Sequence, residues 1–416
     1  MQQLYQSPAS RPLLLSTLLM VILACFLWSC DIVQDISMEE EPYPVEFKEG
    51  KLYPGDYGSY KQFGRHIDIW EDYALIGCQK ENGAYVFKND GNQWSEMDKL
   101  ELRANYGIGD ICFKEDWILV GTEYANGSGK VEVYRMNDDE IEFIQEIHSN
   151  VKEDRFGSAI DISGEYMIIG AKAPWNDCEN CGVNSDPGKA YIYKFSGGLW
   201  TLEADFDADP PRDNDGFGRE VAISDQFAFV KGGNKDTVYV YSNLDGQWTF
   251  HSYLRPEPVL VLEKEYEQHF GHSIQVSGNQ LLIGAPTYPV NGFEEKLGAV
   301  YAYEFQQGEG WMFKAKIMNP NTVPVEEVNE FGSTLKLEGD YMMVGGDTDY
   351  IGGSVVYKLS GDQWINIHYI SPPDDLVTHG FGISMDISEE WMLVGHIGDM
   401  DTGNQAGAVY VFENNY

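Results

Sequence analysis

Paired acidic residues are the first feature of this sequence whose type and spacing could do chemistry. Asp347 pairs with Asp349 and Asp399 with Asp401, each across one residue, and a third cluster reads DNDG over residues 213–216. Calcium takes about six to eight oxygen ligands, commonly with a bidentate carboxylate at a set spacing. None of the three clusters continues into the alternating acids, glycine and distal glutamate of a calcium loop, and Asp and Gly are also ordinary turn residues. We therefore expect no cofactor, and calcium at these acids is the alternative.

Aromatic side chains among polar residues are a second potential binding feature. Trp175, Tyr288 and Phe293 occur in long stretches that also contain Pro, Asn and Gly. Flat rings with a polar edge can stack on sugars or hold a peptide, although the same rings could instead pack against neighbouring loops. We expect these three aromatics, together with Asp347 and Asp399, to contact a ligand.

The cysteines form one close pair outside the N-terminal region. Of the six cysteines, Cys178 and Cys181 lie in the same long stretch as Trp175. A zinc site would need two further ligands, and no second close pair accompanies them. In an oxidising compartment we expect a local disulfide, with a redox-active dithiol as the alternative. Cys78 and Cys112 fall on strand-like stretches and are expected to be small buried side chains.

Signatures of catalysis are missing from the sequence. It contains no Gly-x-Ser-x-Gly elbow, His-Glu-x-x-His pattern, phosphate-binding loop or dinucleotide fingerprint. We therefore expect a protein that is not an enzyme, with a polysaccharide-cleaving propeller enzyme of the glycosidase or lyase type as an alternative. A formal net charge of −39 over 416 residues would repel phosphate backbones, so nucleic acid is not an expected partner.

The elements that must position these residues come from an internal repeat. Stretches that begin with Phe-Gly and end in an apolar run, such as FGSAIDISGEYMIIG from Phe156, recur along the chain. They start at Phe63, Phe156, Phe217, Phe270, Phe331 and Phe381, with a weaker copy at Tyr106. Repeats roughly 40–60 residues apart are typical of propeller blades and solenoids.

Each unit continues with a loop, a third strand that ends in aromatics, a turn and a fourth strand usually opened by Trp, as at Trp311. Four strands in each of seven units predict an all-β fold, a seven-bladed β-propeller of four-stranded antiparallel blades. The period-2 pattern excludes a helical solenoid, and a β-solenoid with its much shorter repeats is the alternative. The seventh unit lacks a fourth strand, and the stretch from Val45 resembles one. We therefore expect the N-terminal strand to close the ring.

The Phe-Gly starts and the Ile-Gly-Ala-Pro stretch at residues 283–286 resemble the FG-GAP repeats of integrin-α-type propellers. They are most similar to the bacterial lipoprotein variety whose units end in Gly-x-x-Trp, and the similarity covers about Val45 to Tyr416. The resemblance implies an extracellular binding or adhesion module, but not a particular ligand. Calcium-binding integrin-type repeats carry Asp-x-Asp-x-Asp-Gly between the first two strands, where this sequence has a tight turn such as Ser-Gly-Glu at 163–165.

Strand order places the longer loops on one face of the predicted propeller. In an antiparallel blade, the 1–2 and 3–4 turns emerge on one face, and the 2–3 loops and blade-to-blade connections on the other. The second set is long, so we expect it to bind ligand. Aligning the first strands on their turns also predicts a hydrated central channel lined at one level by Asp68, Cys112, Asp161, Ala222, Gln275, Lys336 and Asp386.

The N-terminus reads as a targeting segment. Arg11 precedes an apolar run over residues 13–28 that is short for a membrane-spanning helix. The layout resembles a bacterial lipoprotein signal, which implies cleavage before Cys30 and acylation of its thiol. Cleavage at Cys25, an ordinary signal and an uncleaved anchor are the alternatives. We divide the chain into a signal peptide (1–29), an acidic tether (30–43) and the propeller (44–416).

These features together predict a non-catalytic binding or adhesion module at a bacterial cell envelope. We expect it to be exported, held at the outer membrane only by its lipid, and to face the periplasm or the cell surface. Its expected partner is a glycan or a protein bound through the long-loop face. A structural subunit of an envelope complex is a further alternative.

Overall fold

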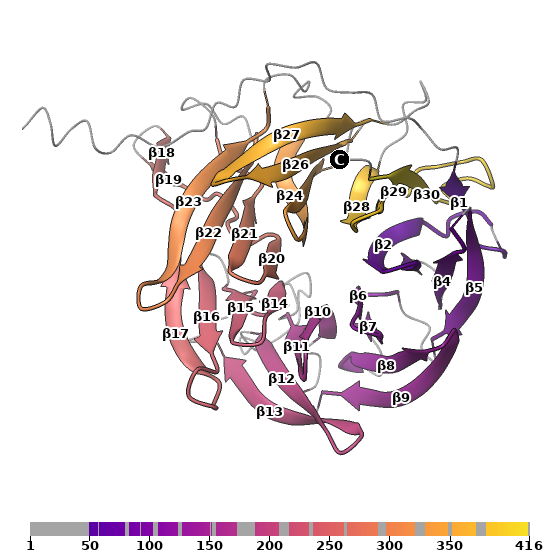
Figure 1. The fold of residues 1–416 in the computed structure, drawn as a ribbon, viewed down its shortest axis with the longest axis horizontal. Coiled ribbons are helices and arrows are strands. Elements are labelled where there is room, and N and C mark those ends of the chain that lie inside the picture. Colours follow the sequence, from indigo (N-terminus) through magenta and orange to yellow (C-terminus); the bar gives the residue numbers. More distant parts are fainter. Residues whose placement is uncertain are drawn as a thin grey trace, which may run out of the picture.

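The computed structural model describes residues 50–56, 58–79, 83–91, 93–102, 107–123, 127–149, 151, 155–172, 188–207, 216–232, 236–261, 264–289, 297–320, 329–347, 352–371 and 380–414. Within these ranges all regular elements are β-strands, and no helix is long and apolar enough to cross a membrane. The strands form seven four-stranded antiparallel sheets arranged as the blades of a ring (Figure 1), so the predicted seven-bladed propeller is confirmed.

In blades 1 to 6 the four strands follow one another in sequence from the axis of the ring outward, and in blade 7 the first three do. Blades 1 to 3 comprise β2 (Phe63–Trp70), β3 (Tyr73–Cys78), β4 (Gly83–Asn89) and β5 (Trp94–Glu101); β6 (Asp110–Lys114), β7 (Trp117–Thr122), β8 (Lys130–Asn137) and β9 (Glu140–His148); and β10 (Phe156–Ser163), β11 (Tyr166–Ala171), β12 (Lys189–Ser196) and β13 (Leu199–Asp207). Blades 4 and 5 comprise β14 (Val221–Ile223), β15 (Phe227–Lys231), β16 (Val238–Ser242) and β17 (Thr249–Leu254); and β20 (Ile274–Ser277), β21 (Gln280–Ala285), β22 (Ala299–Gln306) and β23 (Gly310–Met318). Blades 6 and 7 comprise β24 (Asn329–Glu338), β25 (Tyr341–Asp347), β26 (Ser354–Ser360) and β27 (Gln363–Ile370); and β28 (Phe381–Ile387), β29 (Trp391–His396), β30 (Ala408–Glu413) and β1 (Lys51–Leu52).

The last blade takes its outer strand from the other end of the chain. β1 pairs antiparallel with β30, with Lys51 opposite Tyr410 and Leu52 opposite Val409. The Val411 amide also donates to the Gly50 carbonyl at 3.0 Å. The predicted closure by the N-terminal strand is therefore confirmed for this short pairing, while residues 45–49 lie outside the described residues.

The hydrophobic cores lie between blades rather than within them. Val409 and Val411 of blade 7, for example, share one cluster with Phe63 and Tyr85 of blade 1. The ring of Phe63 is fully buried and meets Tyr85 edge-on at 5.6 Å between centroids. Because burial of apolar area is the main stabilising contribution, each blade depends on its neighbours for stability.

The glycine of the Phe-Gly pair is required where one blade touches the next. Gly332 of blade 6 has φ +93°, and a Cβ at this position would lie 2.6 Å from the Ala299 carbonyl oxygen of blade 5. Gly64 of blade 1 has φ +84°, and its Cβ would lie 2.8 Å from the Ala408 oxygen of blade 7. Only glycine combines that backbone conformation with so close an approach. The glycine of each such Phe-Gly pair thus allows the first strand of one blade to contact the backbone of the preceding blade closely.

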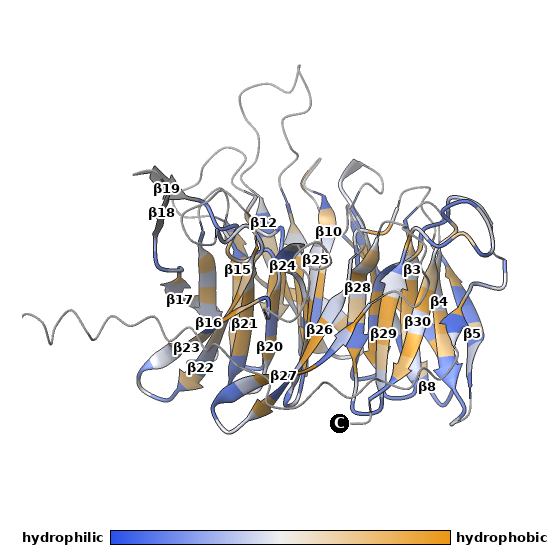
Figure 2. Ribbon diagram, turned by 90° about the horizontal axis from the view of Figure 1, so that it is seen from above, coloured by the Kyte–Doolittle hydropathy of each residue, from blue (hydrophilic) through white to orange (hydrophobic). Residues whose placement is uncertain are grey.

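The two faces of the ring differ in their connections. The turns between the first and second strands contain two or three residues, as at Glu71 and Asp72, and Figure 2 shows the β22–β23 and β26–β27 hairpin turns on the lower side. We call this side the tight-turn face. The opposite side, the long-loop face, carries the longer connections. One of them contains a short hairpin that the sequence had not suggested, β18 (Val259–Val261) with β19 (Lys264–Tyr266), between blades 4 and 5.

Candidate functional site

The innermost strands enclose a channel along the axis of the ring (Figure 1). It is a cavity of about 1040 Å³ lined by residues of β2, β6, β10, β14, β20, β24 and β28 and of their flanking turns. Of the seven residues predicted at one level of the channel, six line it, including Asp68, Lys336 and Asp386. Ala222 instead is buried in the core between blades 4 and 5.

A ring of bulge residues surrounds the channel at the long-loop face. In the first strands of blades 1, 3, 6 and 7 the register shifts just after the Phe-Gly pair, and the Gly adopts positive φ. A bulge re-aims the residue that follows. The residues at this position, or at its equivalent in the other blades, all line the cavity: Arg65, Gly109, Ser158, Arg219, His272, Ser333 and Ile383. Three of the seven are basic and none is acidic.

Deeper in the channel, carboxylates bridge neighbouring blades. Asp386 Oδ2 accepts from the Ile69 amide at 2.6 Å, and Asp68 Oδ2 accepts from the Phe113 amide at 2.6 Å. Asp161 accepts from the next blade in the same way, at 2.8 Å from Ile223 N. Innermost strands have no further strand to pair with on the channel side, so their amides need other acceptors. These carboxylates therefore accept hydrogen bonds from backbone amides that have no strand partner on the channel side.

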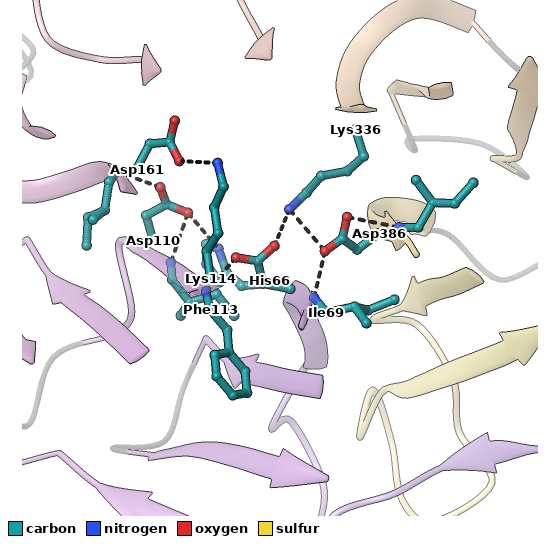
Figure 3. A network of polar contacts seen from close by, with 12 residues as sticks. His66, Ile69, Asp110, Phe113, Lys114, Asp161, Lys336 and Asp386 are labelled. Carbon is teal, nitrogen blue, oxygen red and sulfur yellow. Dashed lines mark hydrogen bonds and ion pairs between the residues drawn. The ribbon is translucent and has the colours of Figure 1, made fainter. Parts of the chain in front are cut away.

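One lysine holds two of these acids together (Figure 3). Lys336 Nζ lies 2.7 Å from Asp68 Oδ1 and 3.5 Å from Asp386 Oδ2. Burial acts to raise the pKa of Asp68. The positive charge of Lys336 and the hydrogen bonds to the carboxylate act in the opposite direction, and the pKa of Asp68 is lowered. Burial raises the pKa of Asp386 well above its usual range in spite of Lys336. Burial would lower the pKa of Lys336, but the two acids raise it. Lys336 thus favours the ionised form of Asp68, whereas burial favours the protonated form of Asp386.

Nearer the long-loop face, three half-buried groups have pKa values shifted toward their neutral forms. Burial raises the pKa of Asp110 to about 7 although the Ile160 and Ile111 amides donate to it. Burial, followed by the charge of Asp110, raises the pKa of Glu220 to about 8. Burial lowers the pKa of His66 to about 3, with Arg65 next in effect. Asp110 and Glu220 can therefore act as proton donors at neutral pH, while His66 is neutral.

The predicted aromatic contact Tyr288 is half-buried at the edge of the core between blades 4 and 5. Lys316 lies over its ring at 4.4 Å from the centroid and donates to its hydroxyl at 2.8 Å. A ligand would therefore meet Tyr288 together with Lys316. Trp175 and Phe293 lie outside the described residues, as do Cys30, Cys178, Cys181 and Asp349, and for Asp347 only its place at the end of β25 is described.

The predicted acids of blade 7 hold the closing strand. Asp399 is buried and accepts from Lys51 Nζ at 3.2 Å and from the Tyr410 hydroxyl at 3.3 Å. Asp401 accepts from the same ammonium and from the Tyr53 hydroxyl, both at 2.9 Å. An ammonium group thus occupies the place between the two acids where a calcium ion would have to lie. Their proposed roles in ligand or calcium binding stay predictions.

Among the residues that the structure describes, no group of three or more His, Cys, Asp or Glu side chains could hold a metal ion. Cys78 and Cys112 are both buried, as predicted from their strand positions. The sequence had not singled out Arg65, Asp110, Arg219 and Glu220. The signal that could have found them is their position three to five residues before the last residue of the first strand of each blade.

Comparisons with known proteins agree with this architecture. A model of the FG-GAP repeat matches residues 150–193, which include β10, β11 and most of β12 of blade 3, and residues 364–412, which include β28, β29 and most of β30 of blade 7. The FG-GAP resemblance is thus confirmed in two places. Among curated proteins, none matches the chain. A crystal structure of a protein from Lactobacillus plantarum is similar to this chain with a TM-score of 0.51 and 12% identity, over 74% of this chain and 85% of that one. At that identity the likeness concerns the fold alone.

Proposed function

We propose that this FG-GAP-repeat propeller is a non-catalytic binding or adhesion module that takes a glycan or a protein on its long-loop face. The observation that carries the proposal is the difference between its two faces. The long-loop face combines the longer connections, the half-buried Tyr288 and the ring of bulge residues around the channel, three of which are basic. Rigid scaffolds that present loops on one side are the usual arrangement for recognition.

The charged pairs of the described residues favour binding over catalysis. Lys336 engages Asp68 and Asp386, and Lys51 engages Asp399 and Asp401, so these carboxylates have structural partners. We further propose that the protein is exported to the cell envelope and anchored there through a lipid on Cys30, as its N-terminal sequence suggests.

One observation favours an enzyme as the second candidate. Asp110 and Glu220 line the channel, and burial raises the pKa of both toward or above neutrality. Carboxyls held protonated in a cavity are suited to donate a proton to a leaving group, as glycosidases require.

A single screen distinguishes the candidates. The purified full-length chain is tested against a polysaccharide array and an envelope-protein extract, with release of new reducing or unsaturated sugar ends followed in parallel. Saturable binding without new ends supports the proposal, and turnover supports the enzyme. Hydrogen exchange then maps the ligand. A footprint around the tight turns at Gly164 and Gly339 would contradict binding at the long-loop face, as would the absence of any ligand.

Tyr288 gives the residue-level test. Tyr288→Ala should weaken binding by about 1–3 kcal/mol, because a ring of this kind is a typical binding hot spot. Phe313→Ala is the matched control, since this aromatic is exposed on the outer strand β23, away from the long-loop face. Equal losses in both variants would point to a general effect on the fold instead.

A further inference from the structure

We propose that the long-loop mouth of the channel binds the carboxylate of an acidic sugar at the end of a glycan. This inference rests on the proposed function of the long-loop face and names a site and a ligand chemistry within it. The mouth is formed by the ring of bulge residues, with Lys172 beside it.

The first argument is the sign of the charge at this mouth. The chain has 28 Lys and Arg against 67 Asp and Glu, yet the bulge ring contains Arg65, Arg219 and His272 and no acid, while Glu330 lines the cavity beside Ser333. Lys172 joins them, because its amide donates to Ser158 Oγ at 3.2 Å and places it next to the ring. Its ammonium group pairs with Glu123 at 2.6 Å. The opposite mouth is lined by the acids Glu71, Asp72, Glu389 and Glu390.

The second argument is that the acids just below the ring do not cancel this charge. Asp110 and Glu220 lie there, and their raised pKa values of about 7 and about 8 leave Asp110 only partly ionised and Glu220 mostly protonated at neutral pH. Burial and then the positive charges of Arg65 and Lys172 lower the pKa of His66, so the field of these cations reaches into the channel. An anionic group at the mouth would meet cations in a partly desolvated place, where charge-assisted hydrogen bonds are strongest.

The third argument concerns what surrounds the anionic group. The remaining lining of this end is rich in hydroxyls, from Ser158, Ser273, Ser333 and Thr334, and Ile383 is the one large apolar side chain of the ring. These hydroxyls donate to backbone carbonyls, so they offer acceptors to the hydroxyls of a ligand, and the lining gives little area to an apolar peptide. The net charge of −39 disfavours a densely charged polymer, so a single acidic sugar fits better than a polyuronate.

The probe for the test is a tetrasaccharide that ends in a hexuronic acid, compared with the same tetrasaccharide reduced at the carboxyl to a neutral hexose. Binding to the full-length chain is measured by calorimetry at low and high salt. Two variants remove cations, Arg219→Gln at an exposed position and Arg65→Gln at a half-buried one. Lys314→Gln is the control, because this lysine pairs with Glu304 on the outer part of blade 5. Melting temperatures establish that all variants fold.

A charge-assisted contact contributes about 1.5–3 kcal/mol, so carboxyl reduction and Arg219→Gln should each weaken binding roughly tenfold to a hundredfold. Lys314→Gln should bind as the unmodified protein does. Equal affinity for the acidic and the neutral sugar would overturn the inference, and so would unchanged binding in both arginine variants. Arg219-dependent binding of an acidic peptide, without binding of the sugar, would overturn the choice of ligand class. Failure to bind the acidic sugar, when another ligand leaves its footprint on the long-loop face, overturns this inference alone.

Discussion

Lys336 on β24 places its Nζ 2.7 Å from Oδ1 of Asp68 on β2, a residue 268 positions away in the sequence. The two strands belong to blades 6 and 1, so the ion pair reaches past blade 7, whose Asp386 lies 3.5 Å from the same ammonium. This contact connects three blades through one side chain. It therefore reports on the integrity of the ring.

Replacing Lys336 should loosen the ring. Lys336→Met leaves Asp68 without its cation in a largely buried place, and we expect the free energy of unfolding to fall by about 1–3 kcal/mol. The measurement is urea unfolding at pH 7. Lys314→Met removes a more exposed pair and should change stability by less than about 1 kcal/mol. An equal effect of the two variants would contradict the role of Lys336 in the channel.

The raised carboxyl pKa values make stability depend on pH. In the unfolded chain, Asp110 and Glu220 ionise near their ordinary pKa of about 4, whereas in the folded protein they ionise at about 7 and about 8. Across this window the unfolded chain binds fewer protons, so the stability contributed by these groups is lost as pH rises. The double variant Asp110→Asn, Glu220→Gln should therefore gain stability at pH 8 relative to pH 5. Melting curves at both pH values test this, with the exposed Glu389→Gln as control; a gain of the same size at both pH values would contradict it.

Ring closure can be tested by two deletions. Removing residues 45–52 deletes β1, its pairing with β30 and the Lys51–Asp399 ion pair, and should cost about 3 kcal/mol or more. Removing residues 32–41, which precede β1, should leave the melting temperature nearly unchanged. Equal melting temperatures for the two deletions would show that β1 does not hold the ring.

Substituting two glycines of blade 6 distinguishes the cost of backbone strain from the cost of a clash between blades. Gly332 and Gly339 both have positive φ, but only Gly332 would bring a Cβ within 4 Å of other atoms. Gly339→Ala should cost about 1–2 kcal/mol for the left-handed conformation alone. Gly332→Ala should cost clearly more, because the clash with Ala299 pushes blades 5 and 6 apart. Chemical unfolding of both variants gives the comparison, and equal losses would argue against a close contact between blades at the Phe-Gly pair.

The proposed lipid anchor depends on Cys30. Cys30→Ala should release the protein from membranes or leave it unprocessed, because no thiol would remain at the expected cleavage site. Labelling with a fatty-acid analogue in cells gives the readout, and Cys25→Ala is the matched control. Continued labelling of the Cys30→Ala protein would move the anchor to Cys25.

The fold could be predicted from the sequence because its determinants are local and repeated. The Phe-Gly pairs recur in every blade but the second, and the missing fourth strand after Val411 pointed to the strand at Lys51. The channel was harder to predict. Aligning the first strands selected Cys112 in blade 2, whereas Asp110, two positions earlier, bridges to Ile160 at 2.8 Å.

The candidate site was predicted less well because its contacts are not local in sequence. The sequence predicts Asp399 as a ligand contact from its pairing with Asp401, and this stays a prediction. Its ion pair with Lys51 joins parts of the chain that lie far apart in sequence, so no local pattern indicates it. Likewise, no pattern within one unit indicates that Lys336 reaches Asp68 beyond the intervening blade. Such contacts depend on side-chain length and channel width, which are set only when all blades are assembled.

The position of β1 has a consequence for the order of events during biosynthesis. Lys51 and Leu52 are synthesised before the other described strands, yet their partners Tyr410 and Val409 belong to the seventh blade and follow the first six blades. Domains generally fold in the order of their synthesis, but this ring can close only after the third strand of the seventh blade has been made. Until then β1 lacks its partner strand β30, and the core shared by blades 7 and 1 is incomplete. Under the export that we propose, this order would keep the ring open until residues 408–413 have crossed the membrane.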